Sequence, residues 1–242
     1  MTSQSSLRVS LRLAEGLLRV SGVTLLEAAI SGMSRERFEQ RIAWWARRVV
    51  EDTQINLRVE GREHLVPGES FIIMSNHQSH LDIPILFHAV TPAMRMVAKK
   101  ELFRFPIFGQ AMREAGFIEV DRQNRAQAIS SLRSSLSLLR EGLHVWIAPE
   151  GTRSVSGELL PFKKGGFWLA LEAGVRILPV ALHGTRDVLP VHAIRTHLGR
   201  SVGLAIDAPL NTQGKDISTL VAETYAVITA LHRRAKELAQ PT

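Results

Sequence analysis

The chain has 242 residues, 45% of them hydrophobic, and its 30 Lys and Arg residues outnumber its 23 Asp and Glu residues to give a net charge of +7. This composition predicts one large domain, or one domain with a small appendage, and excludes a disordered chain. The absence of cysteine excludes a disulfide framework, a thiolate zinc site and a cysteine nucleophile. The positive charge favours an anionic partner, and nucleic acid is the least favoured because no helix-turn-helix, zinc-finger or aromatic RNA-binding signature is present.

The first 50 residues carry eight arginines, four glutamates and two helical patterns. One pattern begins at Leu7 and a second runs from Phe38 to Val49, with arginines on other faces of both. Basic amphipathic helices with Trp and Leu are typical of segments that lie on a membrane, although an ordinary pair of surface helices looks the same. No stretch reaches 18 uncharged apolar residues and charges interrupt the beginning of the chain, so the sequence predicts neither a spanning helix nor a signal peptide and favours an intracellular protein.

From residue 56 the hydrophobic period changes, and short apolar runs alternate with helical patterns. The expected strands are 57–59, 71–74, 94–98, 116–122, 144–148, 175–182 and 202–206, and the expected helices are 83–88, 129–139, 167–173 and 217–231. Pro179 favours an edge position or a bulge for its strand. The alternation predicts an α/β fold with a mixed, largely parallel sheet flanked by helices. We expect an amphipathic helical motif over residues 1–52 and an α/β domain over residues 53–242.

Polar clusters follow four of the expected strands, at residues 76–82, 99–101, 121–122 and 150–153. If these strands are neighbours, the clusters converge at one edge of the sheet. In the first cluster His77 and Asp82 stand five apart, and a carboxylate bonded to one ring nitrogen suits a histidine that acts as a general base. The same cluster contains Ser79-x-x-Asp82, which can equally be a capping box for the next helix.

The last cluster, Glu-Gly-Thr-Arg, has a plausible task for each residue. Gly151 lets a ligand approach the backbone, Thr152 can donate a hydrogen bond, and Arg153 can form two hydrogen bonds to a phosphate. A plain turn has the same composition.

Taken in order, four segments resemble the motifs of the glycerolipid acyltransferases, and most closely those of the bacterial 1-acyl-glycerol-3-phosphate acyltransferases. They are residues 76–82, 116–122, 149–153 and 177–182, with Lys-Lys-Glu-Leu at 99–102 after the first. The resemblance spans residues 57 to 190 and implies the glycerol-3-phosphate acyltransferase-like fold, with an N-terminal helical pair seated on a membrane. Ala148 stands where the family usually has an aromatic residue and Leu178 where it usually has valine, which leaves the acyl-chain preference open.

The resemblance implies transfer of an acyl group from acyl-coenzyme A or acyl carrier protein to the sn-2 hydroxyl of lysophosphatidic acid, giving phosphatidic acid. His77, oriented by Asp82, would remove the hydroxyl proton for direct attack on the thioester. No metal, no further cofactor and no nucleic acid are expected, and the place of action would be the cytoplasmic face of an anionic membrane. The acceptor phosphate would be held by Lys99 or Lys100, Arg122 and Arg153, in a site shaped by Glu150, Gly151 and Thr152.

Alternatives of other kinds stay open. The acceptor can be another lysophospholipid or phosphorylated molecule. A metal-dependent hydrolase would use His77, His80 and Asp82, with His183 or His192 as further ligands. A non-catalytic protein of the membrane surface would keep the fold without turnover. Ser79 as a covalent nucleophile lacks the strained G-x-S-x-G turn.

Overall fold

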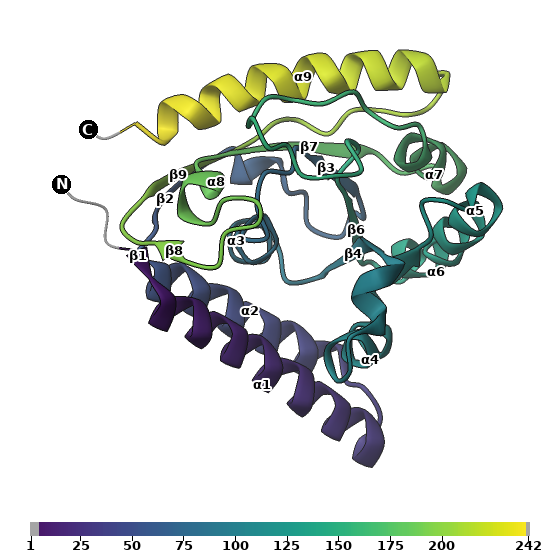
Figure 1. Cartoon of the computed structure of the whole chain (residues 1–242). Coiled ribbons are helices and arrows are strands. Elements are labelled where there is room, and N and C mark those ends of the chain that lie inside the picture. Colours follow the sequence, from purple (N-terminus) through teal and green to yellow (C-terminus); the bar gives the residue numbers. More distant parts are fainter. Residues whose placement is uncertain (1–4, 241–242) are drawn as a thin grey trace.

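The structure is a computed structural model that describes residues 5–240. Its centre is a seven-stranded sheet with the order β2-β9-β7-β3-β6-β4-β5 (Figure 1). The strands are β2 (Asn56–Glu60), β3 (Ile72–Ser75), β4 (Met94–Lys99), β5 (Ile118–Val120), β6 (His144–Ile147), β7 (Ile177–His183) and β9 (Ser201–Ile206). The five strands from β7 to β5 are parallel, β9 is antiparallel to β7, and β2 is parallel to β9. The predicted mixed, largely parallel α/β fold is confirmed.

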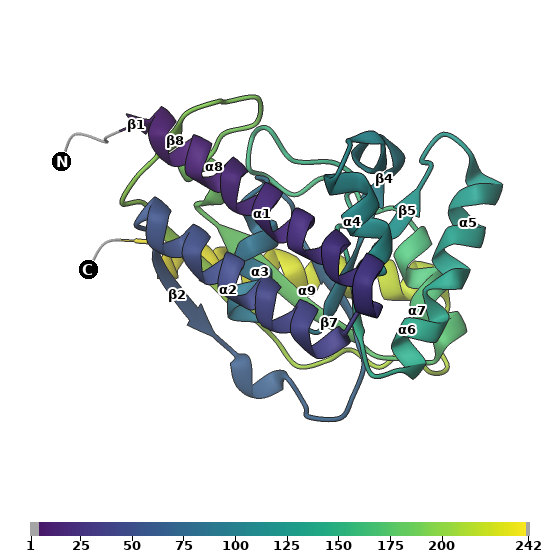
Figure 2. The ribbon, with the colours of Figure 1, turned by 90° about the horizontal axis from the view of Figure 1, so that it is seen from below.

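Helices cover both faces of the sheet (Figures 1 and 2). Alternate strand residues point to opposite faces, so Ile73 packs into one core while Ile72 and Met74 pack into the other. On the face of Ile73 lie α1 (Leu7–Ser31), α2 (Arg35–Thr53), α3 (Asp82–Ala89) and α4 (Phe108–Glu114). On the other face lie α5 (Arg125–Ser134), α6 (Leu136–Arg140), α7 (Gly165–Ala173) and α9 (Ile217–Leu238).

The shorter elements connect these layers. The 3-10 helices η1 (Arg62–His64) and η2 (Lys100–Arg104) follow β2 and β4, and α8 (Thr185–Val188) follows β7. A separate antiparallel pair joins β1 (Ser5–Ser6) to β8 (Thr196–His197). This pair ties the beginning of α1 to the loop that precedes β9.

The first two helices run side by side across one face of the molecule (Figure 2). Ser6 caps α1 by accepting from the backbone N–H of Val9, and Ser34 caps α2 in the same way. Val20 and Phe38 belong to the same core cluster as Ile73, so the helical pair shares a core with the α/β part. The division at residues 52 and 53 stays a prediction. No helix of residues 5–240 is long and apolar enough to cross a membrane.

Two local expectations are wrong. The helix expected over residues 129–139 is two helices, because the buried Ser135 stands between them and its hydroxyl bonds to the carbonyl of Leu132. β7 is an interior strand although it contains Pro179. Its antiparallel ladder with β9 begins only at Val180, and the carbonyl of Pro179 accepts from the N–H of Asp207, so the missing proline N–H falls just outside the ladder.

Candidate active site

The carboxyl ends of four neighbouring parallel strands carry the polar clusters. β3, β6, β4 and β5 are adjacent in this order, and residues 76–82, 150–153, 99–101 and 121–122 follow them respectively. Parallel strands end at the same edge of a sheet, so the clusters meet there. The predicted convergence is confirmed.

The first cluster forms a histidine–carboxylate pair. The Nδ1 atom of His77 lies 2.7 Å from Oδ2 of Asp82, which is fully buried. The same oxygen accepts from the backbone N–H groups of Gln78 (2.6 Å) and Ser79 (2.9 Å). One carboxylate therefore both closes the turn, as a capping residue would, and orients the imidazole. Because Asp82 occupies Nδ1, the Nε2 atom of His77 is the one available to a substrate.

The hydroxyl of Ser79 has a structural role. It donates to the carbonyl of Leu189 (2.8 Å) and accepts from the N–H of Leu81 (3.2 Å). Both bonds hold the turn that carries His77, so the geometry gives no support to a serine nucleophile.

Glu150 supports the backbone of His77 from the neighbouring strand. Its Oε1 accepts from the N–H of His77 (2.9 Å) and its Oε2 from the N–H of Leu160 (3.0 Å), at an exposed fraction of 2%. The carbonyl of His77 in turn accepts from the N–H of Ser154 (2.7 Å). Burial raises the pKa of Glu150 to about 7 although both hydrogen bonds oppose the shift. The loop after β6 thus forms hydrogen bonds with both the N–H and the carbonyl group of His77.

The cations near the site fall into two groups. Lys100 donates to Asp121 (2.6 Å), which joins the ends of β4 and β5, and Arg122 donates to the carbonyl of Gly151. Lys99 and Arg153 have no carboxylate partner among residues 5–240. No carboxylate of the described residues therefore neutralises the positive charge of these two side chains.

His80 is affected by the charges of both Lys99 and Arg153. Burial, followed by the charge of Arg153, lowers the pKa of His80 to about 4, and His77 and Lys99 act in the same direction. His80 is therefore neutral near pH 7. It also lines the apolar cavity described below.

Lys163 is a further cation at the site that sequence reasoning missed. Gly151 has φ +70°, and a Cβ atom there would come within 2.9 Å of the Lys163 ammonium nitrogen. The lysine therefore lies against the same peptide that Arg122 binds. In the sequence, Lys163 lies 12 residues after Gly151 and just before α7, and nothing in this spacing indicates that the two residues are in contact.

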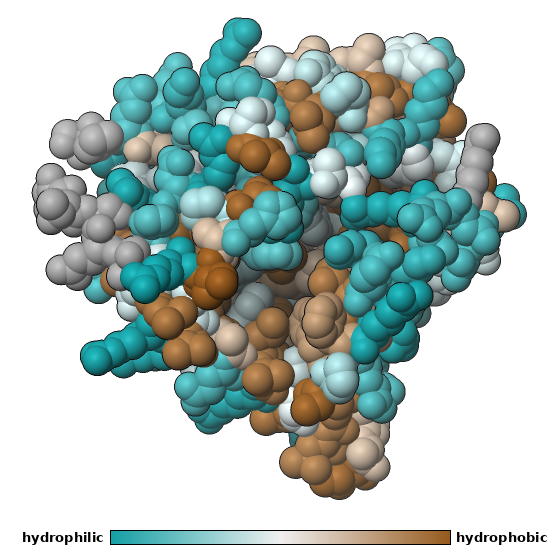
Figure 3. Space-filling model, in the orientation of Figure 1, coloured by the Kyte–Doolittle hydropathy of each residue, from teal (hydrophilic) through white to brown (hydrophobic). Residues whose placement is uncertain are grey.

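An apolar cavity of about 430 Å³ extends from His80 under the first helices. Faces of α1, α2, α3 and α4 enclose it, and its walls include Leu17, Trp45, Phe87, Ala111 and Phe117. Figure 3 shows this side of the molecule, where apolar side chains gather over α1 and α4 below a hollow. The sequence could not locate this cavity, because its walls come from separate helices.

The residues named for a metal-dependent hydrolase are not arranged as a ligand set. Within the described ranges, no group of three His, Cys, Asp or Glu side chains is placed to hold a metal ion. His183 contacts His232 (3.4 Å), and His192 lies in an exposed loop. The geometry therefore gives this alternative no support.

Comparison with known proteins agrees with this geometry. A family model described as Acyltransferase matches residues 56–183. The chain is 33% identical over 161 residues to the 1-acyl-sn-glycerol-3-phosphate acyltransferase alpha of Mus musculus, covering 66% of this chain and 56% of that protein. It is 37% identical over 134 residues to the protein of the same name from Homo sapiens, covering 55% and 47%. The chain thus spans about half the length of these curated relatives.

The likeness to a solved structure extends over nearly the whole chain. The crystal structure of the 1-acyl-sn-glycerophosphate acyltransferase of Thermotoga maritima superposes with a TM-score of 0.80 at 27% identity, covering 98% of this chain and 96% of that one. The family model covers the four strand ends with the His77–Asp82 pair. This chain belongs to the acyltransferase family.

Proposed function

We propose that this protein transfers an acyl group from an acyl thioester to the free sn-2 hydroxyl of 1-acyl-glycerol 3-phosphate. One observation carries the proposal: the turn that holds the His77–Asp82 pair also carries His80, which lines an apolar cavity and feels the charges of two cations without carboxylate partners. A hydrocarbon chain, a proton and a phosphate each have a matching environment there. The names of the relatives support the choice of acceptor.

His77 is the general base in this proposal. Its Nε2 atom takes the proton from the acceptor hydroxyl while the hydroxyl oxygen attacks the thioester carbonyl carbon. Asp82 stabilises the imidazolium that forms, because it already binds the proton on Nδ1. The tetrahedral intermediate then expels the thiolate, which takes the proton back from Nε2. No side chain becomes acylated, in keeping with the absence of cysteine and with the two bonds that hold the Ser79 hydroxyl.

The acceptor phosphate is assigned to Lys99 and Arg153. Both are basic, both act electrostatically on His80, and neither is neutralised by a carboxylate of the described chain. Arg122 and Lys163 extend the positive region around Gly151. Lys100 contributes through its ion pair with Asp121, which fixes the position of its neighbour Lys99.

The acyl chain is assigned to the cavity beneath α1 and α2. Its volume lies within the range of ordinary ligand pockets, and its walls are almost entirely apolar. His80, three residues after His77, is one of the residues that line it. A thioester carbonyl at His77 would thus have its hydrocarbon chain inside the protein.

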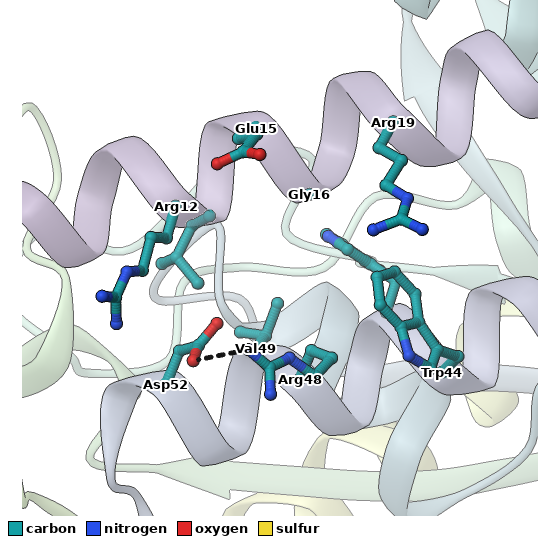
Figure 4. A pocket seen from close by; sticks show the side chains of 10 residues that line it. Arg12, Glu15, Gly16, Arg19, Trp44, Arg48, Val49 and Asp52 are labelled. Atoms are coloured by element: carbon teal, nitrogen blue, oxygen red, sulfur yellow. Dashed lines mark hydrogen bonds and ion pairs between the residues drawn. The ribbon is translucent and has the colours of Figure 1, made fainter.

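The same two helices are assigned to the membrane surface. Leu11 and Ile30 of α1 expose 62% and 75% of their surface. Arg12, Arg19 and Arg48 line a cleft between α1 and α2, where the guanidinium of Arg19 stands 5.4 Å from the centre of the Trp44 ring (Figure 4). Exposed apolar groups next to arginine and tryptophan suit the interface of an anionic bilayer. We place the protein at the cytoplasmic face.

The direct test follows thiol release from an acyl-coenzyme A in the presence of lysophosphatidic acid, for the parent, for His77→Ala and for His88→Ala. His88 is an exposed histidine on α3, and its removal controls for histidine loss. We expect turnover by the parent and by His88→Ala, with a loss of about 10³-fold or more in His77→Ala. Parental activity in His77→Ala would overturn the base assignment.

A further inference from the structure

A second cleft, of about 860 Å³, opens at the carboxyl end of β7, the strand next to β3. Its walls come from the end of β7, α8, the loop before β9 and the last turn of α9 (Figure 1). Val155, in the loop that follows β6, also lines it. The cleft therefore lies at the same edge of the sheet as His77, one strand away.

The charged side chains of this cleft are unbalanced. Arg186, Arg200 and Lys236 face a single carboxylate, Asp187, which leaves a net charge of +2 when the histidines are neutral. In the described part of the chain none of the three cations has an ion pair, and the buried Nε of Arg200 has no hydrogen-bond acceptor. The Nε atom itself is covered by the protein, so a ligand would bind to the other atoms of these side chains. Arginine and lysine bind phosphate groups through charge-assisted hydrogen bonds.

Short contacts connect this cleft to the catalytic turn. Gln78, the residue after His77, donates from Nε2 to the carbonyl of Gly157 (3.0 Å) and lies 3.0 Å from Nε2 of His232. His232 in turn lies 3.4 Å from Nδ1 of His183, which lines the cleft. Burial lowers the pKa of both histidines, so both are neutral near pH 7. A chain of contacts through Gln78, His232 and His183 thus leads from the residue after His77 to the cleft.

A thioester donor consists of an acyl chain and a thiol part, and the apolar cavity provides a binding place for the acyl chain only. With the acyl chain under α1 and α2, the thiol part must leave the site in another direction. We propose that the cleft at β7 binds the phosphate groups of the nucleotide end of coenzyme A. This inference rests on the acyl transfer proposed above. It favours coenzyme A over a carrier protein, because a concave cleft with three cations suits a nucleotide bearing several phosphates, whereas a folded protein requires a flatter surface.

The test compares two donors with the same acyl group, acyl-coenzyme A and acyl-pantetheine, which lacks the nucleotide. The variants are Lys236→Gln, which changes an exposed side chain, and the double variant Arg200→Gln/Lys236→Gln. Arg233→Gln, on the same helix but outside the cleft, is the matched control. We expect kcat/KM for acyl-coenzyme A to fall at least tenfold in the double variant and severalfold in Lys236→Gln, through KM. Acyl-pantetheine kinetics and the control should stay unchanged.

An equal loss with both donors, or an unchanged preference for acyl-coenzyme A, would overturn the assignment. So would turnover by the parent with acyl carrier protein donors alone. Calorimetric binding of adenosine 3′,5′-bisphosphate separates this inference from the proposed reaction. If no thioester is turned over, the proposed function fails. Binding of the bisphosphate to the parent but not to the double variant would still support the nucleotide-binding role of the cleft. Equal binding to both proteins overturns it.

Discussion

The polar and apolar halves of the site are built by different means. Around His77, two buried carboxyl groups accept four backbone N–H groups between them, three from the turn after β3 and one from the loop after β6. The apolar cavity has few polar atoms and is enclosed by faces of four helices. Proton transfer needs atoms fixed to fractions of an ångström, which strand ends and backbone hydrogen bonds supply. A hydrocarbon chain needs only a dry space of suitable shape, which packed helices supply.

The largest expected effect is on the polar half. Asp82→Asn keeps an oxygen that can accept from Gln78 and Ser79, but it removes the negative charge that stabilises a protonated His77. We expect kcat to fall about 10³-fold, equivalent to about 4 kcal/mol, while the circular dichroism spectrum stays parental. A loss below tenfold in a folded variant would mean that the capping role of Asp82 is its main one.

Glu150 provides a test of the same half through pH. Its folded pKa of about 7 exceeds the ordinary value of 4.5 for a glutamate, so the folded state holds the proton more tightly than the unfolded chain. This contribution to stability is complete below about pH 4.5 and is lost as the pH rises through about 7, a change on the order of 3 kcal/mol. Urea unfolding at pH 5 and pH 8 should show the parent losing stability relative to Glu150→Gln. Parallel pH curves for the two proteins would contradict the raised pKa.

The smallest expected effect belongs to the apolar half, where shape rather than exact geometry matters. Ala111 on α4 lines the cavity, so Ala111→Leu fills space that the end of an acyl chain would occupy. Displacing about two methylene groups should lower kcat/KM for a long-chain donor relative to a short-chain donor by about tenfold. The neighbouring Gln110→Leu, on the exposed side of the helix, is the control and should keep the parental profile. An unchanged profile in Ala111→Leu would place the chain elsewhere.

The sequence predicts the polar half well because each cluster is contiguous and follows a strand whose hydrophobic run is clear. Parallel neighbours then bring residues 76–82 and 150–153 together without further information. The apolar cavity, the contact of Lys163 with Gly151 and the cleft beside His183 each combine segments that are distant in the chain. The pairing of Lys100 with Asp121 illustrates the same limit. A cation at a strand end can bind a substrate or a neighbouring carboxylate, and only the relative placement of the two strands decides between them.

The central claim is one-step acyl transfer with His77 as the base and no acylated side chain. Rapid-quench mixing of the protein with a radiolabelled acyl-coenzyme A, first without and then with lysophosphatidic acid, tests it directly. The account predicts no burst of free thiol and no protein-bound label until the acceptor is added. A stoichiometric thiol burst without acceptor, with the label retained on the unfolded protein, would contradict it.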